Sequence, residues 1–248
     1  MTSCDHKADT LARRCAHCSL RRLCLPAGID REDLPNLEKI VRKSPPIDEG
    51  SFLFHAGEES HGVYVVRFGS FKSIRMLANG DEQIVGVHLP GEVFGLDGMA
   101  NRRFNLDSVA LEKSGVCSVS FDQLESIFDR FPTLNRQVMG MMSREVSERH
   151  SHQVLMGRRS AVERVALFLL RYSERLESRG FVGTSFALSL SRQDLANYLG
   201  LQIETVSRTI GKLKEQNILE VDRRLISIES FEHLRDAAGV DQGEAVSF

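Results

Sequence analysis

The fold is decided by one stretch near the C-terminus, which reads Ser191-Arg-Gln-Asp-Leu-Ala-Asn-Tyr-Leu-Gly200-Leu-Gln-Ile-Glu-Thr-Val-Ser-Arg208-Thr-Ile-Gly-Lys-Leu-Lys214. Ser191 followed three positions later by Asp194 is a variant of the capping box that begins helices. Apolar residues then recur at helical spacing up to Gly200, which favours a helix end. A second amphipathic helix is predicted over residues 202–216. Two helices joined by a tight glycine turn predict a helix-turn-helix.

The residues after the second helix predict a wing. Two short apolar strands, Ile218–Val221 and Leu225–Ile228, flank the charged turn Asp222-Arg-Arg. The second helix has an apolar face and, near its N-terminal end, a polar one. The N-terminal end of a recognition helix is the part that enters the major groove of DNA. The candidate DNA-contacting residues are Gln202, Glu204, Thr205, Ser207 and Arg208, together with Arg192 in the preceding helix.

Three of these residues form a polar triad. Glu204, Ser207 and Arg208 are spaced i, i+3, i+4, so they share one helix face. Arginine can bind guanine through two hydrogen bonds, and glutamate can accept one from cytosine. A carboxylate facing DNA is repelled by phosphate unless it reads a base. The alternative is an ordinary solvated helix face, but the capping signal, the glycine turn and the wing favour DNA recognition.

Two further helices are predicted before this unit. Residues 160–178 form an amphipathic helix, and Thr133–Met156 a long one that Gly157-Arg158-Arg159 interrupts. Apolar residues spaced at about 3.5–4 in the long helix predict a dimerisation seam of roughly two heptads. The alternative is a helix packed on its own domain. The segment 147–153 is entirely polar, so the seam is weaker there. The predicted seam residues are Leu134, Val138, Met142 and Val146.

Residues 47–119 have strand character, with a glycine every five to ten residues. Such spacing suits tight turns between short strands and predicts an antiparallel β-roll or sandwich. Asn79-Gly80 is a hairpin signal, because both turn positions of the favoured type need positive φ. A helix beginning near Asp30 and stopped by Pro45-Pro46 precedes the strands, and a helix over 121–131 follows them. The predicted strands are Phe52–Phe54, Val63–Val66, Phe71–Met76, Ile84–Val87 and Val116–Val119.

The N-terminal segment contains a C-x2-C-x5-C array, formed by Cys15, Cys18 and Cys24. Zinc sites favour paired cysteine knuckles, and no second knuckle follows. An iron–sulfur cluster takes four thiolates, the fourth often remote. Cys117 could be that ligand or a small buried hydrophobe, and spacing alone leaves both interpretations open. Cys4 is interpreted as a spare thiol, and His6 and His17 are less favoured ligands.

Bulk properties narrow the class of protein. The chain has 248 residues, 42% of them hydrophobic and 27% charged. No apolar run approaches the roughly 18 residues that span a bilayer. The polar N-terminus lacks a signal peptide core, so we expect a cytoplasmic protein without a membrane partner. In a reducing compartment, clustered cysteines indicate metal or redox chemistry.

Charge and catalytic motifs are also informative. The net charge is −2, and residues 191–228 contain six Arg or Lys against five Asp or Glu. DNA affinity must therefore come from helix geometry and a second subunit more than from a basic field. The sequence shows no nucleophile–base set, phosphate loop or paired carboxylates, so we do not expect an enzyme.

With these residues in view, the chain resembles the FNR/ANR branch of the CRP/FNR transcription regulators from Cys15 to about Leu234. The resemblance rests on the cysteine array with Cys117 and on the long helix before the helix-turn-helix. It rests also on three sets of motifs: Gly69, Asn79-Gly-Asp-Glu-Gln83 and Pro90-Gly-Glu92 in the roll, Asn197-Tyr-Leu-Gly-Leu201, and Glu204-Thr-Val-Ser-Arg208.

The resemblance implies one 4Fe–4S cluster per subunit, held by Cys15, Cys18, Cys24 and Cys117. It implies oxygen sensing, in which the cluster-loaded homodimer binds double-stranded DNA without oxygen and the damaged form becomes monomeric and releases it. The DNA site would be a TTGAT-N4-ATCAA-like palindrome in promoters of anaerobic genes, read by Glu204, Ser207 and Arg208. Gly80 and Asp81 would contact RNA polymerase.

One departure excludes a ligand that some relatives bind. Relatives that bind cyclic AMP have a glutamate in the stretch matching 94–97 and an arginine about ten residues later. This chain has Leu96 and Leu106-Asp107 at those places, so we expect no cyclic nucleotide. Two alternatives remain: the same regulator with a zinc or thiol-redox sensor, or a ligand-binding regulator of the CRP type.

The predicted architecture is α+β, with an N-terminal antiparallel β-roll of the cyclic-nucleotide-binding type, a long dimerisation helix and a C-terminal winged helix-turn-helix. The predicted domain plan has five parts: a cysteine-rich leader at 1–29, a β-roll sensor at 30–131, the dimerisation helix at 132–157, the DNA-binding domain at 158–236 and a flexible tail at 237–248.

Overall fold

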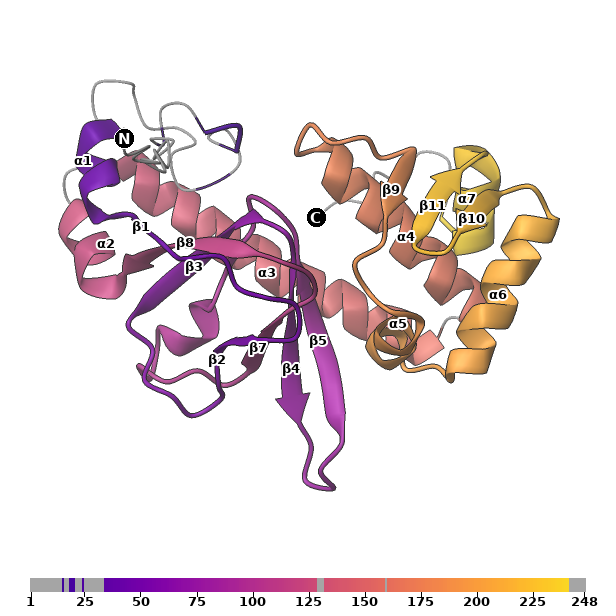
Figure 1. Cartoon of the computed structure of the whole chain (residues 1–248), viewed down its shortest axis with the longest axis horizontal. Helices are drawn as coiled ribbons and strands as arrows, with labels where there is room; N and C mark the ends of the chain where they lie inside the picture. Colours follow the sequence, from indigo (N-terminus) through magenta and orange to yellow (C-terminus); the bar gives the residue numbers. More distant parts are fainter. Residues whose placement is uncertain are drawn as a thin grey trace, which may run out of the picture.

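The computed structural model describes residues 15, 18–20, 24, 34–128, 132–158 and 160–240. Figure 1 shows a β-roll in indigo and magenta, a long helix α3 (Pro132–Arg158) that runs behind it, and a smaller orange and yellow unit at the other end. The α+β class and the order of its parts are confirmed. Among the helices of the described residues, none is both long and apolar enough to cross a bilayer.

The β-roll consists of two antiparallel sheets of four strands each. One sheet has the order β1 (Arg42–Lys43), β8 (Gly115–Ser120), β3 (Gly62–Phe68), β6 (Val93–Phe94). The other has the order β2 (Phe52–Phe54), β7 (Asp107–Ala110), β4 (Phe71–Met76), β5 (Glu82–His88). Aromatic side chains fill the space between the sheets, with the rings of Phe54 and Phe104 stacked at 3.7 Å. The roll thus has its own core.

The first helix is shorter than predicted. Helix α1 (Leu34–Ile40) ends well before Pro45-Pro46, because Arg42 and Lys43 form strand β1 and pair with Ser118 and Cys117 of β8. A two-residue strand has no periodicity that a sequence can reveal. For the same reason β6 was not predicted; β7 was also missed. A short 3-10 turn, Leu96–Gly98, was missed as well.

The hairpin at Asn79-Gly80 is present, although its turn differs from the prediction. Gly80 has a φ of +86°, whereas Asn79 is not among the residues with positive φ. The side-chain oxygen of Asn79 instead accepts a hydrogen bond from the backbone N–H of Asp81 at 3.1 Å. An asparagine that bonds its own backbone two residues later builds a turn without positive φ.

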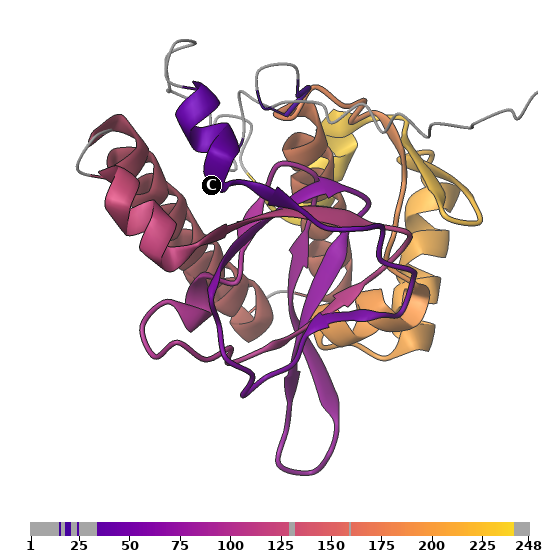
Figure 2. The ribbon, with the colours of Figure 1, turned by 60° about the vertical axis from the view of Figure 1, so that its left-hand side comes forward.

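Helix α2 (Phe121–Phe128) and helix α3 pack beneath the sheet that contains β3 and β8. Figure 2 shows α3 along one side of the roll and the smaller unit on the other. Leu134 and Val138 of α3 are buried among apolar residues of that sheet, α1 and α2. Helix α3 continues through Gly157 and Arg158, so the predicted break falls at its end instead.

The smaller unit is a winged helix-turn-helix. It contains α4 (Ala161–Glu177), α5 (Arg192–Leu199), α6 (Ile203–Glu215) and the sheet β10-β11-β9. The strands are β9 (Ser185–Ala187), β10 (Leu219–Asp222) and β11 (Leu225–Ile228). Ser191 and Asp194 make both hydrogen bonds of the capping box, and Gly200 ends α5 with a φ of +60°. The capping box and the glycine that the sequence indicates therefore mark the observed start and end of α5.

A last helix, α7 (Phe231–Ala238), corrects the predicted tail, because it takes in residues 237 and 238. Ser230 caps its start and Gly239 ends it. Leu234, Ala238 and Val240 are buried in the core of the DNA-binding unit, which is why the helix forms. Residues 241–248 lie outside the described part of the chain.

The β-roll and the DNA-binding unit share one apolar cluster. Ile74, Ile84 and Val87 of the roll belong to the same buried cluster as Leu169 of α4 and Leu199 of α5. Polar contacts also join the roll to the DNA-binding unit. Lys72 pairs with Asp194 at 2.6 Å, and the backbone N–H of Ile84 donates to the side chain of Asn197 at 2.7 Å. The DNA-binding unit is therefore docked on the roll of its own subunit.

Candidate cysteine pocket and nucleic-acid interface

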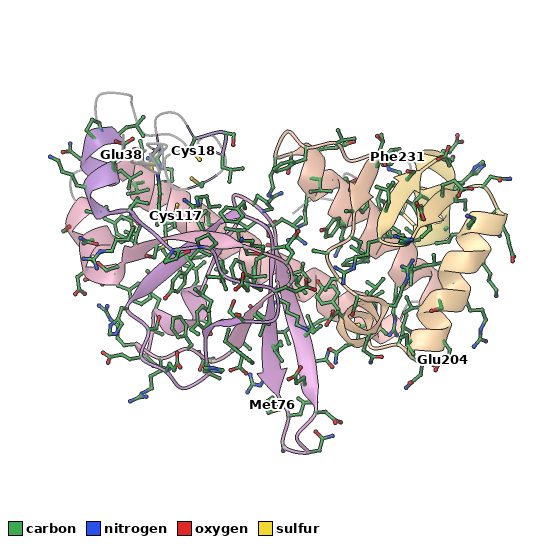
Figure 3. All side chains as sticks on the ribbon, in the orientation of Figure 1. Cys18, Glu38, Met76, Cys117, Glu204 and Phe231 are labelled. Carbon is green, nitrogen blue, oxygen red and sulfur yellow. The ribbon has the colours of Figure 1, made fainter. Side chains whose placement is uncertain are left out.

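The four predicted ligand cysteines line a single cavity. Its volume is about 610 Å³, and its wall includes Cys15, Cys18, Cys24 and Cys117. All four side chains are half-buried, and none of the four forms a disulfide. Figure 3 shows Cys18 above Cys117, with Glu38 of α1 nearby. We call this cavity the thiol pocket. Cys4, His6 and His17 lie outside the described residues, so their predicted roles stay predictions.

Strand pairing fixes the position of Cys117. It lies in β8, a central strand, and its cross-strand neighbours are Lys43 of β1 and Val65 of β3. Directly opposed residues in an antiparallel pair point to the same face of the sheet. Lys43 and Val65 accordingly line the thiol pocket beside Cys117. The sheet thus presents the remote thiol to the N-terminal array.

Burial and mutual repulsion disfavour the thiolate forms. Burial raises the pKa of Cys15 to about 11, and the nearby groups Cys117 and Glu38 act in the same direction. Burial also raises the pKa of Cys24, with Cys18 and Cys15 adding to the effect. The raised pKa values favour the protonated thiols at neutral pH. A bound metal would replace the protons, since metal ligation requires thiolates.

The four thiols are of the right type and number to bind a metal group as thiolates, but in this conformation they do not lie close enough together to hold one. Within the described residues, no three Cys, His, Asp or Glu side chains come together closely enough to hold a metal ion. Four thiols around one cavity supply the ligand number that an iron–sulfur cluster requires. Metal sites of this kind form together with the chain that surrounds them. The residues present therefore fit such a group.

The predicted DNA-reading residues lie on an open face. Glu204, Ser207 and Arg208 are exposed on α6, and Figure 3 shows Glu204 near the start of that helix, pointing away from the molecule. Gln202 is the N-cap of α6 and is also exposed. Thr205 and Arg192 are half-buried. The opposite face of α6 is buried through Val206, Ile210 and Leu213.

The four predicted seam residues of α3 differ in how far their side chains are buried. Leu134 and Val138 are buried in their own subunit, which is the alternative interpretation of the helix. Met142 is half-buried against the same core, whereas 51% of Val146 is exposed. Met139, which the sequence pattern did not single out, is 62% exposed on the same helix. Among the α3 side chains whose burial is described, Met139 and Val146 are thus the large apolar ones exposed to a partner.

Two further features of the roll are the exposed tip of the β4–β5 hairpin and a second cavity. Gly80 and Asp81 are exposed at the end of the β4–β5 hairpin, and Figure 3 places Met76 on the same hairpin. A cavity of about 380 Å³ lies between the roll and α3. Leu96 and Leu106 line it, as does Arg75 of β4, an exposed arginine that the sequence reasoning did not consider. The Ser73 hydroxyl and the His88 ring are hydrogen-bonded there at 2.7 Å.

Comparison with protein families defines the class of protein. A family described as Crp-like helix-turn-helix domain matches residues 163–237, and a family described as Cyclic nucleotide-binding domain matches residues 46–131. A Crp-like helix-turn-helix binds DNA, and regulators of this family are dimers. The fold and the open face of α6 therefore belong to a DNA-binding transcription regulator, and not to an enzyme.

Individual relatives narrow the class. The fumarate and nitrate reduction regulatory protein of Yersinia pestis is 38% identical over 92% of this chain and 91% of its own length. The transcriptional activator protein anr of Pseudomonas aeruginosa is 37% identical over 92% and 94%. The solved structure of FixK2 from Bradyrhizobium japonicum is 32% identical, covers 80% of this chain and 97% of its own, and has a TM-score of 0.73. The chain belongs to the CRP/FNR family and to its FNR/ANR type.

Proposed function

We propose that this regulator senses oxygen through one 4Fe–4S cluster per subunit, held by Cys15, Cys18, Cys24 and Cys117. The observation that carries the proposal is the convergence of four cysteine thiols, from an N-terminal array and a central β-strand, on one cavity. The cluster would supply a group that oxygen destroys, and its iron ions would replace the protons of the four thiols. The N-terminal segment would then be ordered when the cluster is bound and released when it is lost.

The effect on DNA binding would pass through dimerisation. Helix α3 exposes only Met139 and Val146 as large apolar side chains in its described part, which makes a marginal seam. A marginal seam suits a ligand-driven dimer, because a few kcal/mol then decide the equilibrium. The cluster-loaded homodimer would bind a TTGAT-N4-ATCAA-like palindrome in the cytoplasm and control anaerobic genes. Gly80 and Asp81, exposed at the hairpin tip, would contact RNA polymerase.

A cyclic nucleotide is not part of this proposal. The second cavity is lined by Leu96 and Leu106, and its carboxylate, Asp97, accepts a hydrogen bond from the backbone N–H of Asn105 at 2.8 Å. The glutamate and the arginine of the relatives that bind cyclic AMP are replaced here by Leu96 and Leu106-Asp107, and Arg75, the one arginine among the lining residues, is itself exposed. Adding cyclic AMP should therefore leave DNA affinity unchanged.

The sensor is tested by anaerobic reconstitution of the full chain with iron and sulfide. We expect a brown protein with a broad visible absorption band and four iron and four sulfide ions, roughly, per subunit. A colourless protein that binds zinc but neither iron nor sulfide would favour the alternative zinc sensor. A protein that binds no metal but forms a disulfide on air exposure would favour the thiol-redox sensor.

The DNA face is tested on the loaded protein with Arg208→Ala. We expect a loss of about 1–3 kcal/mol in binding free energy and relaxed specificity at one guanine. The measurement compares affinities for the palindrome and for single-base variants of it. An equal loss on every sequence would mean that Arg208 contacts phosphate and does not read a base.

A further inference from the structure

Arg67 lines the same cavity as the remote thiol, Cys117. It lies at the end of β3, where the pairing with β8 shifts register between Val66 and Phe68. Val65, two residues earlier, is paired with Cys117. Arg67 is the extra residue at this irregularity, between Val66 opposite Val116 and Phe68 opposite Gly115. Its side chain lines the thiol pocket together with Cys117.

One nitrogen of Arg67 is buried without an acceptor. Its Nη2 lies 3.4 Å from the carbonyl oxygen of Ser44, and its guanidinium lies over the ring of Phe68 at 5.1 Å. Its Nε has no hydrogen-bond partner among the described residues. A buried donor left without an acceptor costs about 1–3 kcal/mol. Such a cost indicates that an acceptor is missing from this side of the pocket.

Other buried polar atoms do not share this location. In the described part of the chain, three further side-chain atoms are buried without a hydrogen bond: Oγ of Ser60, Oγ of Ser108 and Nε of Arg179. None of these three residues lines the thiol pocket. The missing acceptor at Arg67 is therefore specific to the wall that carries the cysteines.

The charge of the pocket wall has one sign. Lys43, the cross-strand neighbour of Cys117 in β1, also lines the pocket. Among the described lining residues, Arg67 and Lys43 are the charged ones, and none is a carboxylate. Glu38 opposes them at Cys15 from outside the wall. Two cations beside four thiols form a site for an anion.

We propose that Arg67 is a positioning residue for the cluster: it supplies the pocket with a hydrogen-bond donor and, with Lys43, the positive charge that retains a thiolate-bound cluster. The inference rests on the proposed function. A cluster with four thiolate ligands is an anion overall, so adjacent positive charge stabilises it. Hydrogen bonds and charge near the sulfur atoms also set its reduction potential.

The test uses the full chain, reconstituted under anaerobic conditions, with Arg67→Gln and Arg67→Lys. The matched control is Arg42→Gln, which removes the same charge from the residue next to Lys43 in β1, a residue that does not line the pocket. Two quantities are measured: the rate at which an iron chelator bleaches the visible band, and the midpoint potential of the cluster. Thermal unfolding of the cluster-free chains shows whether each variant folds.

We expect Arg67→Gln to lose the cluster about 10-fold faster, since partners of metal ligands typically contribute 10–100-fold to affinity. Its potential should shift to more negative values, because less positive surroundings disfavour the reduced cluster. Arg67→Lys keeps the charge but not the Nε donor and should fall between wild type and Arg67→Gln. Arg42→Gln should match wild type.

The outcomes separate this inference from the proposed function. If wild type is loaded and Arg67→Gln equals Arg42→Gln in both measurements, Arg67 has no role at the cluster and the proposed sensor stands. If wild type binds neither iron nor sulfide, both ideas are wrong. If Arg67→Gln does not fold, Lys43→Gln replaces it, and a loss rate equal to that of Arg42→Gln then contradicts the proposal.

Discussion

Two polar centres of the β-roll, the thiol pocket and the site around Glu92, differ in how completely their groups are partnered. Glu92 follows β5 in a tight turn, and both its oxygens bind arginines of the DNA-binding unit. Arg175 donates to them at 2.9 and 2.6 Å, and Arg179 at 2.6 Å. The backbone N–H of Leu89 adds a fourth hydrogen bond at 2.8 Å. The carboxylate is thus satisfied within the protein.

The thiol pocket is the incomplete counterpart. Burial raises the pKa of Cys15, Cys24 and Cys117, and Nε of Arg67 in the pocket wall has no acceptor among the described residues. The contrast concerns the acceptor groups. The Glu92 carboxylate has its donors within the protein, although Nε of Arg179 beside it is also buried without a hydrogen bond, whereas the four thiols converge on a cavity that a ligand would fill. Changes in the two regions should therefore have opposite consequences.

The largest contrast is expected from Cys117→Ser. This variant should bind essentially no iron–sulfur cluster, because one of four ligands is lost, while the cluster-free fold should stay within about 1 kcal/mol of wild type. Iron and sulfide analysis and urea unfolding measure the two effects. A variant that retains the cluster would show that Cys117 is not the fourth ligand and that the pocket wall was misassigned.

Glu92→Gln should show the reverse pattern. Only 13–16% of each charged side chain in the Glu92–Arg175–Arg179 site is exposed, so two buried guanidinium groups would lose their counter-charge. Breaking such a pair typically costs about 3–5 kcal/mol, measurable by urea unfolding. Cluster loading under anaerobic conditions should be retained. The matched control is Glu59→Gln, whose side chain is 69% exposed. Equal effects in the two variants would contradict the structural role of Glu92.

Acid should remove the contribution of the Glu92 carboxylate to the free energy of unfolding. Burial by itself would raise the pKa of Glu92, but the charges of Arg175 and Arg179 prevail and lower it from 4.5 to about 2. A lowered pKa adds stability that is fully present above the unfolded value and is lost as the pH falls. The gap in unfolding free energy between wild type and Glu92→Gln should therefore shrink from pH 4.5 toward pH 2. A gap that stays constant over this range would mean that Glu92 does not act through its charge.

The smallest effect is expected from Lys72→Met. The ion pair of Lys72 with Asp194 links the roll to the first helix of the helix-turn-helix, and 17% of the Lys72 side chain and 20% of the Asp194 side chain are exposed. Its loss should cost about 1 kcal/mol, because the change removes the cation and leaves a single carboxylate that other groups still bind. Asp194 keeps its hydrogen bonds to Ser191, so the capping box should persist. A loss as large as that of Glu92→Gln would place Lys72 among the essential contacts between the two units.

The sequence revealed the elements whose signals are local. Ser191, Asp194 and Gly200 specify their own helix ends, and the two strands of the wing were correctly placed within one residue. The cysteine array identified a metal or redox site, but Lys43 and Arg67 escaped notice. Their relation to Cys117 depends on strand register, which joins residues 43, 65 and 117. No spacing along the chain encodes that register.

Helix α3 shows the limit of a periodic pattern. Apolar residues at helical spacing show that a helix has a buried face, but not which surface covers that face. Leu134 and Val138 turned out to pack on their own roll, whereas Met139 and Val146 are exposed. Helix α7 was missed because it is short, and its burial depends on contacts with α4 that are distant in sequence.

The position of Cys117 also affects the unfolded chain. A group bound jointly by Cys24 and Cys117 would act as a cross-link that closes a loop of about 93 residues. Closing a loop of roughly 100 residues removes conformational entropy from the unfolded ensemble equivalent to about 4–5 kcal/mol in the chain-entropy model. Loss of the cluster to oxygen would then also shorten the lifetime of the folded chain. A chain that loses its cross-link unfolds, and meets proteases, more often than one that keeps it.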